Sequence, residues 1–300
     1  MTDSYSAPSS SVIEIQRVTR RFGHKTALDD VSLTVPRGGV FGLIGGNGAG
    51  KTTLIRHVLG LLRAETGSVR VFGLDPVEQP VGTLGRIGYL SEDRDLPEWM
   101  RVRELMRYTQ AFYPRWDEAF AEELREMFDL DPTTKVKNLS RGQRARTGLL
   151  LSLAHRPDLL VLDEPSSGLD PVVRRDILGA IIRTIAEEGR TVLFSSHLLD
   201  EVERVADRVA IIHQGRILLT AAMDDIKETH RRLTLRFPSP VHAAPSLVGA
   251  LSCTGSGTEW TYQCSGDRLQ LRSAAEALGA TIVDDGALSL DDIFITRVQG

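Results

Sequence analysis

The sequence has few cysteines and no long apolar run. Cys253 and Cys264 are its only cysteines, and neither lies beside residues that would complete a metal site. This composition excludes a disulfide framework and favours two reduced thiols in a cytosolic protein. No stretch of about 18 or more residues is apolar and free of charge, so we predict that the chain does not itself cross a membrane.

The chain also lacks a strong excess of charge of either sign. Its formal net charge is −4 over 300 residues, which argues against general affinity for nucleic acid and leaves room only for a local basic patch. Hydrophobic residues make up 41% and charged residues 25%, as in an ordinary globular protein. The first eleven residues, MTDSYSAPSSS, are polar and contain no apolar segment, so we predict a disordered tail over 1–11 rather than a signal peptide.

Apolar runs alternate with helical stretches over most of the chain. The runs at 40–44, 159–162, 191–195 and 208–212 are typical of parallel strands that helices cover on both faces. Segments near the N-terminus alternate apolar and polar residues, which is typical of antiparallel strands set against the main sheet. The pattern therefore predicts an α/β layered fold with a mostly parallel sheet and an antiparallel β subdomain.

Two helices and a second domain are also indicated. Residues 117–128 have amphipathic helical spacing, and Asp170 followed by Pro171 begins a helix that ends before Gly189. Past about residue 222, short strand patterns alternate with one or two helices. We therefore predict a small C-terminal α/β domain over 223–300.

The segment LIGGNGAGKTT, residues 43–53, places four glycines within six residues. Each glycine costs about 0.5–1 kcal/mol relative to alanine in regular structure, so the bare backbone must have a use. Gly45, Gly50, Lys51 and Thr52 match G-x-x-x-x-G-K-[ST], in which amides and a helix start hold phosphates, the lysine reaches the β- and γ-phosphates and the hydroxyl meets Mg²⁺. The alternative is a flexible glycine loop before an ordinary helix.

Two carboxylates follow a buried strand in LLVLDEPSSGLDP. Ligands bind at the carboxyl ends of parallel strands, which is where Asp163 and Glu164 emerge. Asp163 suits Mg²⁺, and Glu164 suits polarising an attacking water. The alternative is an acidic turn before Pro165.

A second helix start with anion-binding character occurs at NLSRGQ. Ser140 can cap a helix whose first turn contains Gly142 and Gln143. A single nucleotide usually needs one such helix start, so a second copy of the chain could use the other.

With these motifs identified, residues 12–220 resemble the ATP-binding subunit of ABC transporters. GGNGAGKTT resembles the family's Walker A, LSRGQ its signature and LLVLDEP its Walker B. SSGLD resembles the D-loop, and the region around His197 the switch-histidine segment. The resemblance implies an ABC ATPase domain over 12–222, with a helical subdomain at about 92–156 that carries the signature.

The resemblance also implies a head-to-tail dimer, with each ATP between the Walker A of one copy and the signature of the other. It implies Glu164 and His197 as catalytic residues and Thr52, Asp163 and Glu92 as ligands of Mg²⁺. The implied nucleotide-binding residues are Phe22, Gly45, Gly46, Asn47, Gly48, Ala49, Gly50, Lys51, Thr52, Thr53, Ser140, Arg141, Gly142, Gln143 and Asp170. Phe22 would stack on adenine; the alternative is a core phenylalanine.

Three positions depart from the family pattern. Gly46 stands where proline is usual, and Arg141 replaces the first glycine of the signature pair. The Arg141 guanidinium can either reach phosphate or the partner copy, or project into solvent. Glu92 occupies the place of the Q-loop glutamine; an ionised carboxylate only accepts hydrogen bonds and adds negative charge near Mg²⁺.

The sequence therefore predicts an ATP-hydrolysing transporter subunit with a separate membrane permease, located on the cytoplasmic face of the membrane. LSLDDIFI near the end resembles the ending of exporter ATPases, which favours export. Arginines 94, 101, 103 and 107 mixed with Trp99, Met100, Leu105 and Met106 indicate a docking surface for the permease; the alternative is a solvated helix face.

Two other classes of function remain as alternatives. A soluble ABC ATPase of translation or DNA repair would carry two cassettes or a long coiled-coil insertion, and neither is present. A GTPase would need a guanine-reading [NT]-K-x-D motif, which TKVK at 134–137 does not complete.

Overall fold

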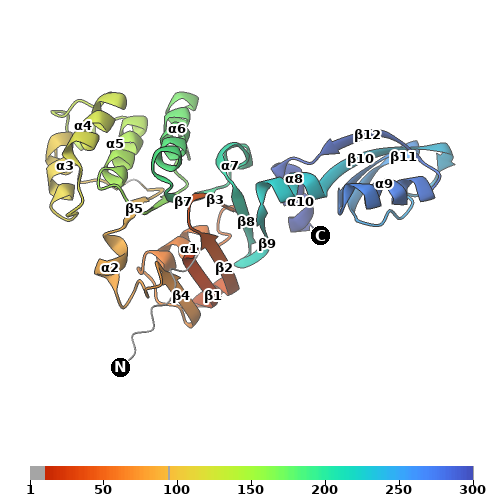
Figure 1. Ribbon diagram of the computed structural model, residues 1–300, viewed down its shortest axis with the longest axis horizontal. Helices are drawn as coiled ribbons and strands as arrows, with labels where there is room; N and C mark the ends of the chain where they lie inside the picture. Colours follow the sequence, from red (N-terminus) through yellow and green to blue (C-terminus); the bar gives the residue numbers. More distant parts are fainter. Residues whose placement is uncertain (1–10, 94, 300) are drawn as a thin grey trace. The chain divides into compact units, whose positions relative to one another are not determined.

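The computed structural model describes residues 11–93 and 95–299, and the chain divides into two compact units, Met1–Thr220 and Ala221–Gly300 (Figure 1). Most of the predicted N-terminal tail, residues 1–10, lies outside the described ranges. Ser11, which the prediction assigned to the tail, belongs to the first strand. Among the described residues, no helix is both long and apolar enough to span a membrane.

A six-stranded sheet forms the centre of the first unit, in the order β5-β6-β7-β3-β8-β9. Its strands are β3 Gly39–Ile44, β5 Ile87–Leu90, β6 Leu159–Asp163, β7 Thr191–Ser196, β8 Arg208–His213 and β9 Arg216–Ala222. Every residue of β6 and β7 is buried, as helix-covered strands require, and the pairs from β5 to β8 are parallel. The predicted parallel sheet is confirmed.

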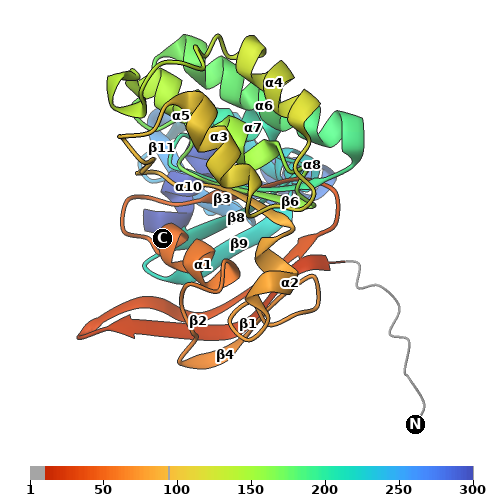
Figure 2. The same ribbon diagram turned by 90° about the vertical axis from the view of Figure 1, so that its left-hand side faces the viewer.

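A three-stranded sheet lies beneath it, in the order β2-β1-β4. Strands β1 Ser11–Phe22, β2 Lys25–Pro36 and β4 Thr66–Val71 pair antiparallel, as predicted for the first two. Helix α1, Lys51–Val58, lies between this sheet and the parallel sheet (Figure 2). Ile13, Leu54 and Leu193 belong to one buried cluster, so a single core joins the two sheets through α1.

Helices cover the opposite side of the parallel sheet (Figure 2). They are α3 Val102–Gln110, α4 Glu118–Met127, α5 Arg141–Leu153 and α6 Pro171–Glu188. The shorter elements of this unit are α2 Pro80–Leu84, a 3₁₀ turn at Val136–Asn138 and α7 Leu199–Val205. The capping predictions hold: Asp170 Oδ1 accepts hydrogen bonds from the amides of Val172 and Val173 at 2.9 and 3.1 Å.

The second unit is an antiparallel sheet, in the order β11-β10-β12, with three helices. Its elements are α8 Met223–Thr229, β10 His230–Val241, β11 Ala250–Ser265, α9 Arg268–Ala277, β12 Thr281–Ala287 and α10 Leu290–Gln299. Leu235, Tyr262 and Leu271 belong to its own core. The strands are longer than predicted, because buried and exposed residues alternate along an antiparallel strand and interrupt its apolar runs. The described part of this unit also contains three helices, where one or two were predicted.

Candidate functional site

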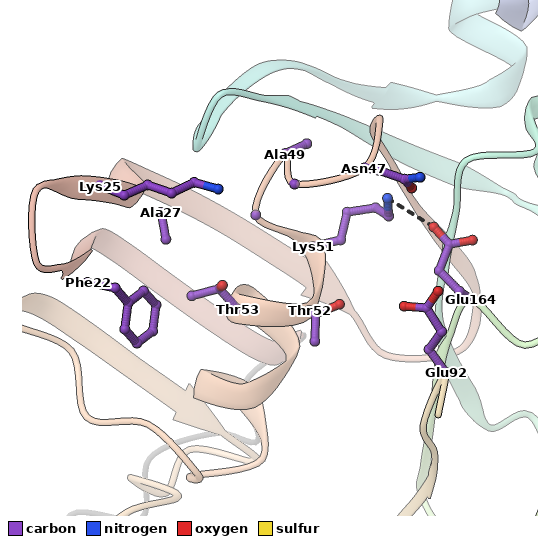
Figure 3. Close-up of a pocket in the computed structure, with 12 residues that line it drawn as sticks. Phe22, Lys25, Ala27, Asn47, Ala49, Lys51, Thr52, Thr53, Glu92 and Glu164 are labelled. Carbon is purple, nitrogen blue, oxygen red and sulfur yellow. Dashed lines mark ion pairs between the residues drawn. The ribbon is translucent and has the colours of Figure 1, made fainter. Parts of the chain in front are cut away.

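A pocket of about 300 Å³ opens at the loop between β3 and α1 (Figure 3). Its lining residues are Phe22, Lys25, Ala27, Asn47, Gly48, Ala49, Gly50, Lys51, Thr52, Thr53, Glu92 and Glu164. The sequence predicts all of these as site residues except Lys25 and Ala27. Segments from β1, β2, the glycine loop, the end of β5 and the end of β6 therefore meet at one place.

The glycine loop has a backbone that other residues could not adopt without strain. Gly48 and Gly50 lie at φ 75° and 116°, in the left-handed region. A Cβ at Gly50 would also lie 2.7 Å from the carbonyl oxygen of Ala27, so the loop packs against β2 through its bare backbone. At Gly46, by contrast, no atom lies within 4 Å of an added Cβ. Packing therefore does not require the glycine that replaces the family's proline.

Lys51, the first residue of α1, is buried beneath this loop. Its Nζ donates hydrogen bonds to the carbonyl oxygens of Gly45 and Gly46 at 2.6 and 3.2 Å. The same atom lies 2.9 Å from Oε1 of Glu164, the ion pair marked in Figure 3. Because both side chains are nearly inaccessible, each charge compensates the other in a place where an unpaired charge would be costly.

Glu164 and His197, the two predicted catalytic residues, are in direct contact. Oε2 of Glu164 lies 2.6 Å from Nδ1 of His197 and 3.3 Å from its backbone amide nitrogen. The Glu164 amide donates to Ser195, to the carbonyl at 3.2 Å and to Oγ at 3.0 Å. Glu164 has φ 47°, a left-handed conformation that persists in a non-glycine residue only when its surroundings hold it. Such strain is typical of functional sites.

Asp163 is a buried carboxylate with one oxygen unsatisfied. Oδ1 accepts a hydrogen bond from the Ser195 hydroxyl at 2.6 Å, whereas Oδ2 has no hydrogen-bond partner within the described part of the chain. Burial raises the pKa of Asp163, and the hydroxyl groups of Ser195 and Thr52 oppose that rise. A buried carboxylate oxygen without a hydrogen-bond partner, in a side chain that also interacts with the Thr52 hydroxyl, fits a divalent cation.

The fit is to Mg²⁺ rather than to a cation enclosed by protein ligands. Within residues 11–93 and 95–299, no three His, Cys, Asp or Glu side chains gather as a metal site. Mg²⁺ needs few protein ligands because it keeps waters and takes oxygens from bound phosphates. Glu92 lines the same pocket and extends toward Thr52 and Glu164 in Figure 3.

Phe22 lies at the mouth of the pocket with 45% of its surface exposed, which excludes the core alternative. Across the β1–β2 hairpin it pairs with Lys25. The Lys25 ammonium extends toward the glycine loop (Figure 3), and a Cβ added at Gly48 would lie 3.9 Å from it. Lys25 reaches the pocket only because its strand pairs with β1, so the sequence pattern did not predict it as a site residue.

The signature residues do not line this pocket. Ser140 caps α5: its Oγ accepts from the Gln143 amide at 3.2 Å, and the Gln143 side chain accepts from the Ser140 amide at 3.0 Å. Gly142 lies in the same first turn, and Asp170 caps α6. None of these residues belongs to the lining of the pocket around Lys51.

Arg141 lies against the D-loop of its own chain. An added Cβ at Gly168 would be 3.1 Å from its Nη1. Arg141 and Gly168 line a second pocket of about 520 Å³ together with Glu92 and Asp93. Two of the three departures from the family pattern, Glu92 and Arg141, thus border one cavity with opposite charges.

The predicted docking surface needs a correction. Met100, Leu105 and Met106 are buried, not exposed: the helical spacing of α3 directs Leu105 and Met106 into the core, and Met100 is buried just before the helix begins. Trp99 is 71% exposed, as the prediction required. Arg94 lies outside the described residues. The exposed aromatic residues around α3 are instead Trp99, Tyr108 and Phe112.

Comparisons with known proteins agree with this geometry. The profile of the family described as ABC transporter matches residues 28–167. The daunorubicin resistance ATP-binding protein DrrA3 of Streptomyces coeruleorubidus is 37% identical over 73% of this chain and 71% of its own. The bacitracin transport ATP-binding protein BcrA of Bacillus licheniformis is 32% identical over 74% of each chain.

A solved structure shares the fold as well. It is described as the ATP-binding subunit of an ABC transporter, has 29% sequence identity and a TM-score of 0.67, and the match covers 72% of this chain and 92% of that one. These relatives favour a transporter subunit over the soluble alternatives. A glycine loop with its buried lysine, a strained glutamate in contact with a histidine, and relatives of this identity lead to one conclusion: the chain belongs to the ATP-binding proteins of the ABC transporter family, whose activity is ATP hydrolysis.

Proposed function

We propose that the protein powers export through a separate membrane-spanning permease, by ATP-driven head-to-tail dimerisation of two copies. One observation carries the proposal: the pocket around Lys51 is lined by Glu164, which contacts His197, whereas the capped start of α5 lies outside this pocket. A second copy can bring that helix start to the phosphates bound in the first pocket.

The pocket residues would divide the work of holding ATP. Phe22 stacks on the adenine, and the amides of the glycine loop with the start of α1 bind the phosphates. Lys51 leaves Glu164 for the β- and γ-phosphates, because a phosphate offers it more negative charge than one carboxylate does. Lys25 adds a second ammonium at the outer side of the loop.

Hydrolysis would follow from the pair at the end of β6 and β7. Glu164, released from Lys51, polarises the attacking water, and His197 holds the Glu164 carboxylate and the γ-phosphate. Thr52, Asp163 and Glu92 would hold Mg²⁺, which neutralises charge on the phosphates when bound. The partner copy contributes Ser140, Gly142 and Gln143, and Asp170 links the two sites.

A membrane partner accounts for the exposed aromatic residues. Phe112 and Val81 are 64% and 89% exposed and line an apolar groove of about 840 Å³ between α2 and the end of α3. Trp99 and Tyr108 lie in the same part of the chain. We place the permease contact here, on the cytoplasmic face of the membrane. The names of these relatives, daunorubicin resistance and bacitracin transport, and the LSLDDIFI ending support export.

ATP-dependent dimerisation of Glu164→Gln tests the proposal. The amide cannot activate water and no longer competes as an anion for Lys51, so the variant should bind ATP at least as tightly as wild type. Its turnover should fall by about a thousandfold. Light scattering should show a dimer with ATP and Mg²⁺ and a monomer with ADP.

A matched double variant separates dimerisation from binding. Glu164→Gln with Ser140→Arg blocks the helix start that the partner would offer, so ATP should bind but no dimer should form. A monomeric Glu164→Gln under saturating ATP and Mg²⁺, with the permease supplied, would rule out the proposed dimer.

A further inference from the structure

Glu201 is a buried carboxylate that the proposed mechanism does not use. It lies on α7, four residues after His197, and only 3% of its surface is exposed. Burial raises its pKa, and the Ser166 hydroxyl and the Arg174 guanidinium oppose that rise. Burying a charge costs desolvation free energy unless hydrogen bonds or an opposite charge compensate it. The partners of Glu201 therefore indicate its role.

Those partners belong to the segment that follows Glu164. Oε2 of Glu201 accepts a hydrogen bond from the hydroxyl of Ser166, which is itself 2% exposed. Oε1 lies 3.9 Å from Nη1 of Arg174 and has no hydrogen bond among the described residues. Arg174 in turn donates from Nε to the carbonyl of Leu169 at 2.9 Å. One carboxylate thus joins α7 to the D-loop and to the first turn of α6.

This junction runs beside the contact between the catalytic residues. Glu164 and His197 meet at 2.6 Å, and their chains continue directly to Ser166 and Glu201, which meet again. The left-handed backbone at Glu164, φ 47°, needs its surroundings to hold it. The contact between Ser166 and Glu201 restricts the two segments that carry Glu164 and His197. Both residues are buried, so water does not compete for this hydrogen bond.

We propose that Glu201 is a positioning residue that holds the Glu164–His197 pair in its hydrolytic orientation through Ser166 and Arg174. The inference rests on the proposed ATP hydrolysis. A glutamine at 201 would still accept from Ser166 but would present no charge to Arg174. The carboxylate itself therefore carries the role.

The test compares Glu201→Gln and Ser166→Ala with wild type in the full chain. We expect kcat to fall about tenfold or more in each variant, while the ATP dissociation constant changes less than about threefold. Both variants should melt within about 4 °C of wild type. In the double variant, kcat should fall by less than the product of the two single losses, because Ser166 and Arg174 both act through the Glu201 side chain.

Asp200→Asn is the matched control. Asp200 is exposed and neighbours Glu201 on α7, so its variant should retain wild-type kcat. Ser166→Thr keeps the hydroxyl and should restore most of the activity lost in Ser166→Ala. If Glu201→Gln fails to fold, Ser166→Ala still decides the question.

The outcomes separate the two proposals. Wild-type kcat in a folded Glu201→Gln or Ser166→Ala protein would overturn the role of Glu201 alone. Additive losses that follow weakened ATP binding would also overturn it, since they would indicate general damage to the pocket. A wild-type chain without ATPase activity would overturn both this inference and the proposed function.

Discussion

At the scale of single residues, the pocket gathers charge where the chain is most buried. Lys51 pairs with Glu164 at 2.9 Å, whereas Asp163 forms no ion pair among the described residues, and its Oδ2 is unsatisfied. The charge of Glu164 beside it raises the pKa of Asp163 further, after burial. The carboxylate that we propose as a Mg²⁺ ligand is therefore retained at the expense of stability in the protein alone.

Asp163→Asn should make the nucleotide-free protein more stable and its nucleotide binding independent of Mg²⁺. The amide retains the Ser195 hydrogen bond and removes a buried charge, so we expect the free energy of unfolding to rise by about 1–2 kcal/mol. Denaturant unfolding and calorimetric titration of ATP with and without Mg²⁺ check both parts.

Glu123→Gln serves as the surface control for this prediction, because Glu123 is exposed on α4. Its stability and Mg²⁺ dependence should equal those of wild type. A destabilised Asp163→Asn protein, or one in which Mg²⁺ still strengthens ATP binding, would contradict the assignment of Asp163.

At the scale of elements, the end of α5 is anchored by a buried histidine. His155 stacks on Tyr113 with ring centroids 3.9 Å apart, and its Nε2 lies 3.1 Å from the carbonyl oxygen of Ile87 in β5. Burial lowers the pKa of His155 from 6.5 to about 4, so the ring is neutral in the folded protein. Protonation of His155 would therefore destabilise the end of the helix that carries the signature.

The lowered pKa of His155 makes the stability of the folded protein depend on pH. Between pH 6.5 and about 4 the unfolded chain binds a proton at His155 that the folded chain refuses, so stability is lost as the pH falls through this window. The loss from this group approaches about 1.4 kcal/mol per pH unit. Urea unfolding across the window should show a shallower slope for His155→Gln than for wild type.

His24→Gln is the control, because His24 is exposed in the same unit and should keep the wild-type slope. His155→Gln loses the ring contact with Tyr113 and should be less stable at neutral pH, so the comparison concerns the slope alone. Equal slopes in all three proteins would show that His155 is not the titrating group.

At the scale of the whole molecule, the two units have separate cores. The buried cluster of the first unit extends from Val12 to Ile212, and that of the second from Leu233 to Ala280. Each unit has the length of a domain that can bury enough apolar surface to fold. Deleting the second unit therefore removes no residue from the buried cluster of the first.

A chain ended after Ala222 should fold and bind ATP within about threefold of the full chain. Circular dichroism and calorimetry on this variant check the prediction, and the full chain should show an additional unfolding transition that the variant lacks. Loss of folding or of ATP binding would show that the first unit needs the second.

Most of the fold follows from local patterns. Runs such as 159–162 are apolar on both faces, which only a helix-covered parallel strand accommodates, and the caps at Asp117, Ser140 and Asp170 act within three residues of themselves. The glycine loop with Lys51 is equally local. Residue spacing therefore predicted these elements, and the resemblance of their motifs to known ones indicated the family.

Other features depended on segments that are distant in the sequence. Met100 and Met106 are buried although they lie among arginines in the sequence, and Lys25 reaches the pocket only through strand pairing. Ser195 and Glu201 contact residues more than thirty positions away. The local sequence determined the glycine loop, the helix caps and the family resemblance. The tertiary structure decided which distant side chains contact Glu164 and Asp163, because those contacts depend on how the strands and helices pack against one another.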